Sequence, residues 1–242
     1  MRYEVQRGRL KMKETLITSQ YFGFVASIFL YLLAVQIRKK LKTPLFNPLL
    51  VSCIMIIGLL LLLKIPYQQY ATETGILSYL LTPATVCLAI PMYRQLRLLR
   101  SNFPAILVSV LVGTLGSMGT IFTLGVVLRL APTHIITLLP KSITTAIGMG
   151  VSEETGGIVT LTVVSIVLTG ILGSIIAEPL FRILKIDHPI ARGLALGTAA
   201  HAIGTAKALE YGEIEGAMSS LSIVIAGVLT VIFVPLISRL II

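Results

Sequence analysis

The stretch AILVSVLVGTLGSMGTIFTLGVVL, residues 105–128, contains no charged residue and is dominated by aliphatic and small side chains. About 20 predominantly apolar residues are enough for an α-helix to cross the hydrocarbon core of a bilayer. Similar stretches recur along the chain at Ile17–Ile37, Leu45–Leu63, Ile158–Ile176 and Ala217–Ile242. The sequence therefore predicts an all-α bundle of transmembrane helices, with seven or eight spans.

The composition excludes an ordinary soluble domain. Of the 242 residues, 55% are hydrophobic and only 12% are charged, whereas about a quarter of the residues of soluble domains are charged. No segment between the apolar stretches could fold separately in water, so we expect residues 17–242 to form one membrane domain. Residues 1–16 are expected to be an N-terminal tail, in which Met12 is an alternative start because several basic residues precede it.

The formal net charge of +10 is concentrated in short segments between the apolar stretches. The three clusters comprise Arg38, Lys39, Lys40 and Lys42; Arg94, Arg97 and Arg100; and Arg182, Lys185 and Arg192. Basic residues gathered in short loops mark the cytoplasmic side of a membrane protein. This placement favours three cytoplasmic loops over a nucleic-acid partner.

The sequence also resembles itself. Residues 83–118 align without gaps on residues 140–175, and Ala146-Ile147-Gly148 recurs as Ala202-Ile203-Gly204. Each unit has a short apolar segment, a polar or Gly/Pro break and a longer apolar segment. Internal repeats with paired interrupted segments are typical of secondary transporters. We expect half-repeats at about 17–130 and 131–242, inverted because basic residues follow the first break and acidic ones the second; a simple duplication of helical hairpins is the alternative.

Three broken stretches, 81–91, 139–157 and 189–207, are unusually polar for membrane depth. Backbone groups freed by proline or glycine must find partners there, and the amino end of a half-helix favours an anion. The candidate substrate-binding residues are Pro83, Thr85, Pro140, Lys141, Ser142, Thr144, Thr145, Gly148, Arg192, Gly197, Thr198, His201, Gly204, Thr205 and Lys207. The candidate proton-coupling groups are Glu153, Glu154, His201, Glu210 and Glu213.

Each of these candidates also has a purely structural interpretation. Lys141 can extend its ammonium toward the membrane interface. His201 titrates near neutral pH, which suits proton coupling, but a buried histidine can equally be satisfied by a carbonyl of a neighbouring helix. Pro83 can simply kink a helix.

Nothing in the sequence indicates an enzyme. It has no Gly-x-Ser-x-Gly, His-Glu-x-x-His or phosphate-loop motif, and Asp187 is the only aspartate. The two cysteines, Cys53 and Cys87, lie in apolar segments and are expected to form neither a disulfide nor a metal site. We therefore expect no catalytic residue, no metal and no cofactor.

The broken stretches resemble the LrgB/CidB family. The resemblance rests on Pro83-Ala84-Thr85 with Ala89-Ile90-Pro91, on residues 140–145, and on residues 188–198 with His201, and it covers the chain from about Thr18. It implies a multi-pass protein of the bacterial plasma membrane that works with a smaller holin-like partner of the LrgA/CidA type. The family was named for modulating murein hydrolase activity and cell lysis. Related proteins are linked to transport of small monocarboxylates, namely pyruvate in bacteria and glycolate or glycerate in a plant plastid relative that fuses both partners.

Two functions stay open at this point. The first is a transporter, or transport subunit, for a small monocarboxylate that is held between residues 140–148 and 197–207. The second is an antiholin-like regulator of murein hydrolase activity or export, and of cell lysis, that moves no solute itself. The sequence leaves open the substrate, the coupling ion, homo-oligomer formation and the need for the partner.

Overall fold

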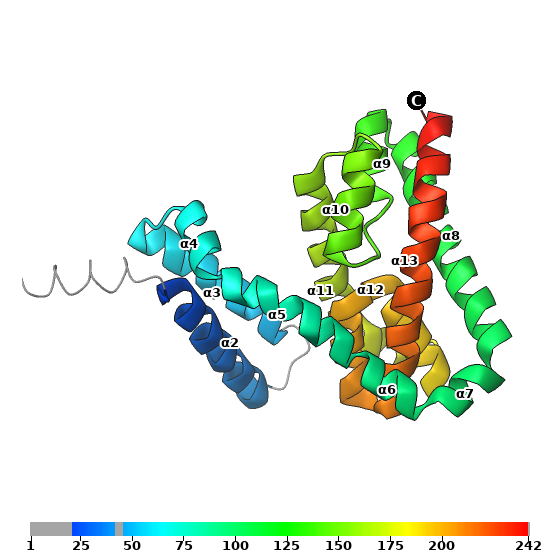
Figure 1. Ribbon diagram of the computed structural model, residues 1–242, viewed down its shortest axis with the longest axis horizontal. Coiled ribbons are helices and arrows are strands. Elements are labelled where there is room, and N and C mark those ends of the chain that lie inside the picture. Colours follow the sequence, from blue (N-terminus) through cyan, green and yellow to red (C-terminus); the bar gives the residue numbers. More distant parts are fainter. Residues whose placement is uncertain (1–20, 42–45, 242) are drawn as a thin grey trace, which may run out of the picture. The chain divides into compact units, whose positions relative to one another are not determined.

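The computed structural model describes residues 21–41 and 46–241, and every regular element in these ranges is a helix (Figure 1). The predicted all-helical class is thus confirmed. The chain divides into two compact units, residues 1–86 and 87–242, which are described separately below. The predicted tail, residues 1–16 with Met12, lies outside the described residues, and the prediction of one membrane domain with two half-repeats stays a prediction.

The first unit contains α2 (Phe22–Leu41), α3 (Pro48–Leu63), α4 (Tyr67–Glu73) and α5 (Gly75–Cys87), whose last residue already belongs to the second unit. Polar contacts join α2 to α4, because the Gly23 amide donates to the Glu73 carboxylate at 2.7 Å and the hydroxyls of Ser27 and Tyr70 are 2.8 Å apart. The side chain of Asn47 caps α3 by accepting from the Leu49 amide at 2.9 Å.

Helix α5 differs from the sequence-based expectation. The sequence predicted that both prolines within residues 81–91 interrupt the helix; an interruption does lie in this stretch, but α5 remains helical through Pro83 and ends at Cys87. A proline removes a single backbone donor, and membrane helices tolerate it when the remaining hydrogen bonds are kept. The next helix begins at Ala89 and contains Pro91, so the first of the three predicted breaks is reduced to a turn at Leu88.

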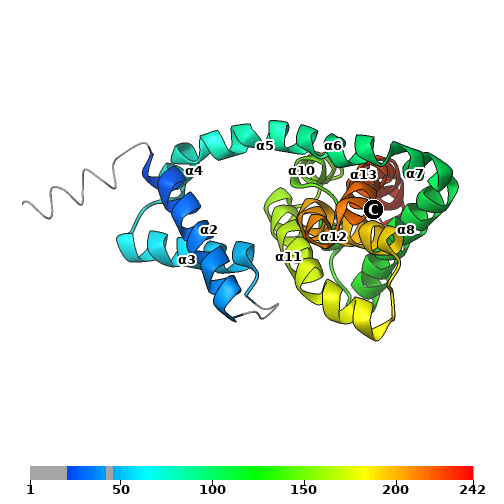
Figure 2. The same cartoon turned by 90° about the horizontal axis from the view of Figure 1, so that it is seen from below.

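The second unit is built around two long helices. In chain order it contains α6 (Ala89–Arg94), α7 (Leu96–Ser101), α8 (Phe103–Val127), α9 (Pro132–Leu138), α10 (Thr145–Glu154), α11 (Val159–Ile183), α12 (Pro189–Tyr211) and α13 (Glu213–Ile241). Helices α12 and α13 lie in the middle, with α8 on one side and α11 on the other (Figure 2). Part of the core between α8, α12 and α13 is formed by Ile106, Val110, Leu194, Met218 and Ala226.

Four described helices are long and apolar enough to cross a bilayer: α2, α8, α11 and α13. Helix α3 is apolar but has only 16 residues. Helices α8 and α11, which contain the paired long segments of the sequence repeat, both have 25 residues. The chain is therefore a membrane protein, while seven or eight spans and inverted repeats stay predictions.

Helix α12 is broken at His201. This residue has φ 44° and ψ −133°, which no helical residue adopts, and holding a non-glycine residue at such angles costs about 1–3 kcal/mol. A Cβ atom at Gly204 would overlap the carbonyl oxygen of Leu196, which lies eight residues earlier. In a straight helix these residues would be about 12 Å apart. The chain therefore bends sharply at His201, within the third stretch that the sequence singled out.

A second break separates α9 from α10. Residues 139–144 are not part of either helix, and Thr144 is extended with φ −66° and ψ 146° directly before α10 begins at Thr145. Proline at position 140 is compatible with this local structure because it cannot donate a backbone hydrogen bond. Both breaks belong to the second unit.

Buried hydroxyls hold the three helices around this second break together. The Thr162 hydroxyl on α11 is 2.7 Å from the Ser152 hydroxyl on α10 and 2.9 Å from the Thr137 carbonyl on α9. The hydroxyl of Thr137 in turn accepts from the Ile158 amide at 2.8 Å. Since all these groups are paired, the cluster stabilises the packing of α9, α10 and α11.

We expect Thr162→Val to lower the free energy of unfolding by about 1–3 kcal/mol, because it leaves the buried Ser152 hydroxyl and Thr137 carbonyl short of a partner. The measurement is thermal unfolding of the purified protein in detergent. The matched control is Thr160→Val, since Thr160 is an exposed threonine on the same helix. Equal melting temperatures for the two variants would contradict the structural role of this cluster.

Candidate functional site

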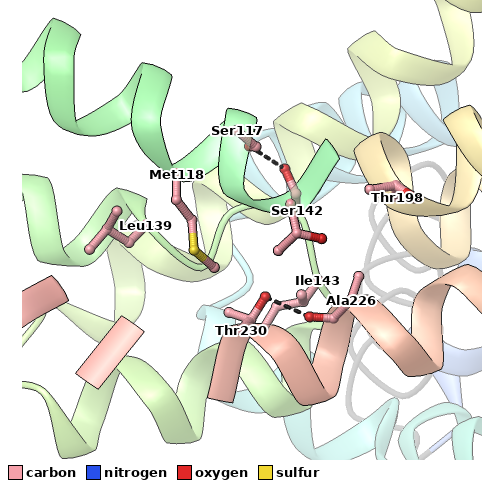
Figure 3. A pocket seen from close by; sticks show the side chains of 9 residues that line it. Ser117, Met118, Leu139, Ser142, Ile143, Thr198, Ala226 and Thr230 are labelled. Carbon is pink, nitrogen blue, oxygen red and sulfur yellow. Dashed lines mark hydrogen bonds between the residues drawn. The ribbon is translucent and has the colours of Figure 1, made fainter. Parts of the chain in front are cut away.

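A small, partly open hollow with room for about one water molecule lies in the second unit, between the two breaks (Figure 3). Its walls come from α8, α12, α13 and the segment that joins α9 to α10. The lining residues are Thr114, Ser117, Met118, Leu139, Ser142, Ile143, Thr198, Ala226 and Thr230. Five of these carry hydroxyl groups and four are apolar, so the hollow is amphipathic.

The hollow lies at mid-span depth. Thr114 and Ser117 occupy the middle of α8, and Ala226 and Thr230 lie near the middle of α13. Both helices are long and apolar enough to cross a membrane. In this conformation the hollow is too small for an organic anion, so binding of one requires its walls to move apart.

A cation adjoins the hydroxyl side of the hollow. The ammonium of Lys141 donates to the Ser142 hydroxyl at 2.9 Å and to the Ser117 hydroxyl at 3.2 Å. The two serine oxygens are 3.3 Å apart and face one another in Figure 3. No salt bridge joins Lys141 to an acidic side chain in the part of the chain that the structure describes. The positive charge is thus fixed by neutral partners and available to an anion.

Further hydrogen-bond donors lie at or next to the hollow. The hydroxyl of Thr114 is buried and has no partner among the described residues. Ser142 and Ile143 lead directly into α10, and no side chain caps the amino end of that helix. The first amides of a helix have no partner within it and carry a partial positive charge. The ammonium, the hydroxyls and this helix end together form a site suited to a small anion.

Two glycines allow the flanking helices to approach α12 at its break. A Cβ atom at Gly113 of α8 would lie 3.0 Å from Thr198, and one at Gly170 of α11 would lie 2.8 Å from the His201 ring. The ring of His201 is 3% exposed, and its Nε2 is 2.9 Å from the Ile166 carbonyl of α11. Thr198 thus lines the hollow, whereas His201 packs against α11 and is not among the lining residues.

Several other predicted site residues serve close packing. Pro140 is fully buried, and a Cβ atom at Gly148 would overlap Ile166. At Gly197 and Gly204 the neighbouring atoms leave no room for a side chain. The hydroxyl of Thr205 is 2.7 Å from that of Ser219 on α13. Thr144 and Thr145 begin α10 next to the hollow but do not line it.

The other predicted cations lie outside the hollow and are engaged locally. Arg192 donates to the Ile186 carbonyl at 2.7 Å and to the Asp187 carboxylate at 2.8 Å. Lys207 donates to Glu210 at 2.8 Å and lies over the ring of Tyr211. These contacts stabilise the two ends of α12.

The glutamates proposed for proton coupling are also absent from the lining. Glu153 and Glu154 are exposed on α10, and Glu210 pairs with Lys207. Glu213 forms an exposed ion pair with Arg94 at 3.2 Å, which joins α13 to α6.

Pro83 and Thr85 belong to the first unit, while all lining residues belong to the second. The coupling roles and the roles of these two residues stay predictions.

Of the predicted site, the structure brings together Ser142 and Thr198 in the lining, with Lys141 beside them. Each of the two hydroxyl residues lies four residues before the alanine of the recurring Ala-Ile-Gly. Sequence reasoning missed the lining residues Thr114, Ser117, Met118, Leu139, Ile143, Ala226 and Thr230. A hydroxyl in the middle of a long apolar segment was the available signal for three of them.

Comparisons with known proteins identify the family of the chain. The model of the LrgB-like family matches residues 27–240. A Bacillus subtilis (strain 168) protein, described as uncharacterized protein YwbG, is 36% identical over 218 residues, which cover 89% of this chain and 97% of that protein. No solved structure gives a significant match.

Proposed function

The chain belongs to the LrgB-like family of membrane proteins, and on this premise we propose that it transports a small monocarboxylate, such as pyruvate or glycolate, across the bacterial plasma membrane. It acts as the transporter itself or as the transport subunit beside a holin-like partner of the LrgA type. The observation that carries this proposal is a hydroxyl-lined hollow in the middle of two candidate spans, with an unpaired lysine charge at its edge.

The charged and polar groups of the hollow match one carboxylate. A carboxylate only accepts hydrogen bonds, and it forms its strongest ones with cationic donors. The Lys141 ammonium already contacts the Ser117 and Ser142 hydroxyls, so an arriving carboxylate meets donors that are held in place. The uncapped start of α10 adds a partial positive charge.

The apolar side of the hollow limits the rest of the substrate. Met118, Leu139, Ile143 and Ala226 offer no hydrogen-bond donor from their side chains. A second charged group placed against them would lose its hydration without compensation. A single carboxylate with a short, uncharged carbon chain therefore fits better than a dicarboxylate.

The two breaks suggest how the site opens in turn to each side. Transporters with internal repeats place the substrate between discontinuous helices and move one part of the fold against the other. Here the hollow lies between the segment that precedes α10 and the bend of α12. We propose that movements at these breaks expose the anion alternately to the two membrane faces.

The test is uptake of radiolabelled pyruvate into vesicles that contain the purified chain, alone or together with its LrgA-type partner. We expect uptake above that of protein-free vesicles, competition by other small monocarboxylates and weak competition by dicarboxylates. Uptake that never exceeds the protein-free background in either preparation would overturn the transport proposal.

That negative result would leave the antiholin-like function as the alternative. Its own measure is the autolysis rate of cells from which the gene is deleted and then restored. A Lys141→Gln variant that restores normal autolysis at unchanged protein level, together with absent uptake, would identify a regulator that does not need the anion site.

A further inference from the structure

The hydroxyl of Thr114 is in an unusual situation for a threonine in an apolar helix. Thr114 is only 6% exposed, lines the hollow, and its Oγ1 has no hydrogen-bond partner in the described part of the chain. One other buried side-chain atom shares this condition there, the hydroxyl of Tyr211 at the end of α12, which is outside the hollow.

Other threonines of the long helices show how such a hydroxyl is normally satisfied. In an apolar helix it donates to the carbonyl four residues earlier. Thr120 of the same helix does so to Gly116 at 2.7 Å, and Thr230 does so to Ala226 at 2.7 Å. Thr114 makes no such bond to Val110. A buried hydroxyl without a hydrogen-bond partner lowers the stability of the folded protein. A bound ligand that accepts a hydrogen bond from Thr114 would remove this cost.

The position of Thr114 relative to the cation defines which part of a ligand it meets. Thr114 and Ser117 are three residues apart on α8, so their side chains lie on one face of the helix about 5–6 Å apart. Ser117 belongs to the Lys141 cluster that is suited to the carboxylate. A group on the carbon next to that carboxylate would therefore lie near the Thr114 hydroxyl.

We infer that Thr114 is a specificity-determining residue, whose hydroxyl donates a hydrogen bond to an oxygen on the carbon adjacent to the substrate carboxylate. This inference rests on the proposed function, because it takes the Lys141 cluster as the seat of the carboxylate. It predicts that the site prefers 2-oxo and 2-hydroxy acids to plain carboxylic acids of equal length.

Pyruvate and propionate test this inference, because they have the same three-carbon chain and differ at the second carbon only in the oxo group. For the wild-type protein we expect about tenfold tighter binding of pyruvate, which corresponds to one hydrogen bond to a group that is otherwise unpaired. Thr114→Val, which keeps the shape of the side chain, should remove this preference, and Thr114→Ser should retain most of it. The matched control is Thr120→Val on the same helix, which should keep the preference.

Binding is measured as the rise in melting temperature of the detergent-purified protein with each acid, and uptake into vesicles is measured in parallel. Without ligand, Thr114→Val should melt at the same or a higher temperature than the wild type, since it removes an unpaired buried hydroxyl. A purely structural role would instead lower the melting temperature and weaken both acids equally, which would overturn the inference. Selective binding without uptake would overturn transport alone, and absence of binding of both acids to the wild type would overturn both proposals.

Discussion

Replacing Lys141 with glutamine is expected to lower the initial rate of pyruvate uptake at least about 100-fold. The substitution removes the cation nearest to the hollow, while Ser117 and Ser142 keep their hydroxyls. A hydrogen bond to a charged group contributes about 1.5–3 kcal/mol, and a buried anion without a countercharge loses further binding energy. A total near 2.7 kcal/mol corresponds to a factor of about 100.

The measurement is uptake of labelled pyruvate by vesicles that contain equal amounts of folded wild-type or variant protein. Lys207→Gln is the matched control, because Lys207 also lies in a polar stretch but is paired with Glu210 and lies over Tyr211. We expect this control to stay within about twofold of the wild type, because it removes no group near the hollow. If the Lys141 variant retained half of the wild-type rate, the anion would have to be held elsewhere.

Introducing a single methyl group at Gly197 is expected to prevent stable packing of α12 on α13. A Cβ atom there would overlap the Ser219 carbonyl and the Ser222 hydroxyl, and the backbone of Ser219 is part of α13. Overpacking usually costs about 1–3 kcal/mol and more where the backbone must shift. Because domains are stable by only about 5–15 kcal/mol, Gly197→Ala should sharply reduce the yield of monodisperse protein and lower its melting temperature.

A glycine on α8 provides the control for this substitution. A Cβ atom at Gly116 would have no neighbouring atom within 4 Å, and alanine is favoured over glycine in a helix by about 1 kcal/mol. We therefore expect Gly116→Ala to melt at or above the wild-type temperature. If Gly197→Ala melted as the wild type does, α12 and α13 could not be as closely packed as the structure describes.

The membrane class and the family could be predicted because they depend on local features of the sequence. Long uncharged segments determine helices, and residues 140–145 and 188–201 identify the family wherever they lie in space. The breaks near Pro140 and His201 lie in stretches marked by proline, glycine and polar residues. Within residues 81–91 the break lies at Leu88 and not at Pro83, because a single lost backbone donor leaves the rest of a helical ladder intact.

The site was only partly predictable, because charge alone does not show where a side chain is directed. Arg192 and Lys207 were singled out as cations, yet each is neutralised by an acidic residue close by in the sequence, Asp187 and Glu210. The only signal for Thr114 was a hydroxyl in the middle of a long apolar segment, which it shares with Ser117 and Thr230. What distinguishes Thr114 is that its buried hydroxyl has no hydrogen-bond partner among the described residues, and the sequence cannot show this.

Among the described residues no acidic side chain pairs with Lys141, and this determines how membrane voltage would act in the proposed cycle. When the site is empty, the moving part of the protein carries one positive charge; when a monocarboxylate is bound, the two charges cancel. A potential of 100 mV does work of about 2.3 kcal/mol on one elementary charge that crosses the whole membrane. Voltage would thus act on the return of the empty carrier and leave the crossing of the loaded one almost unaffected. A potential that is negative inside would oppose this return during uptake and favour it during export.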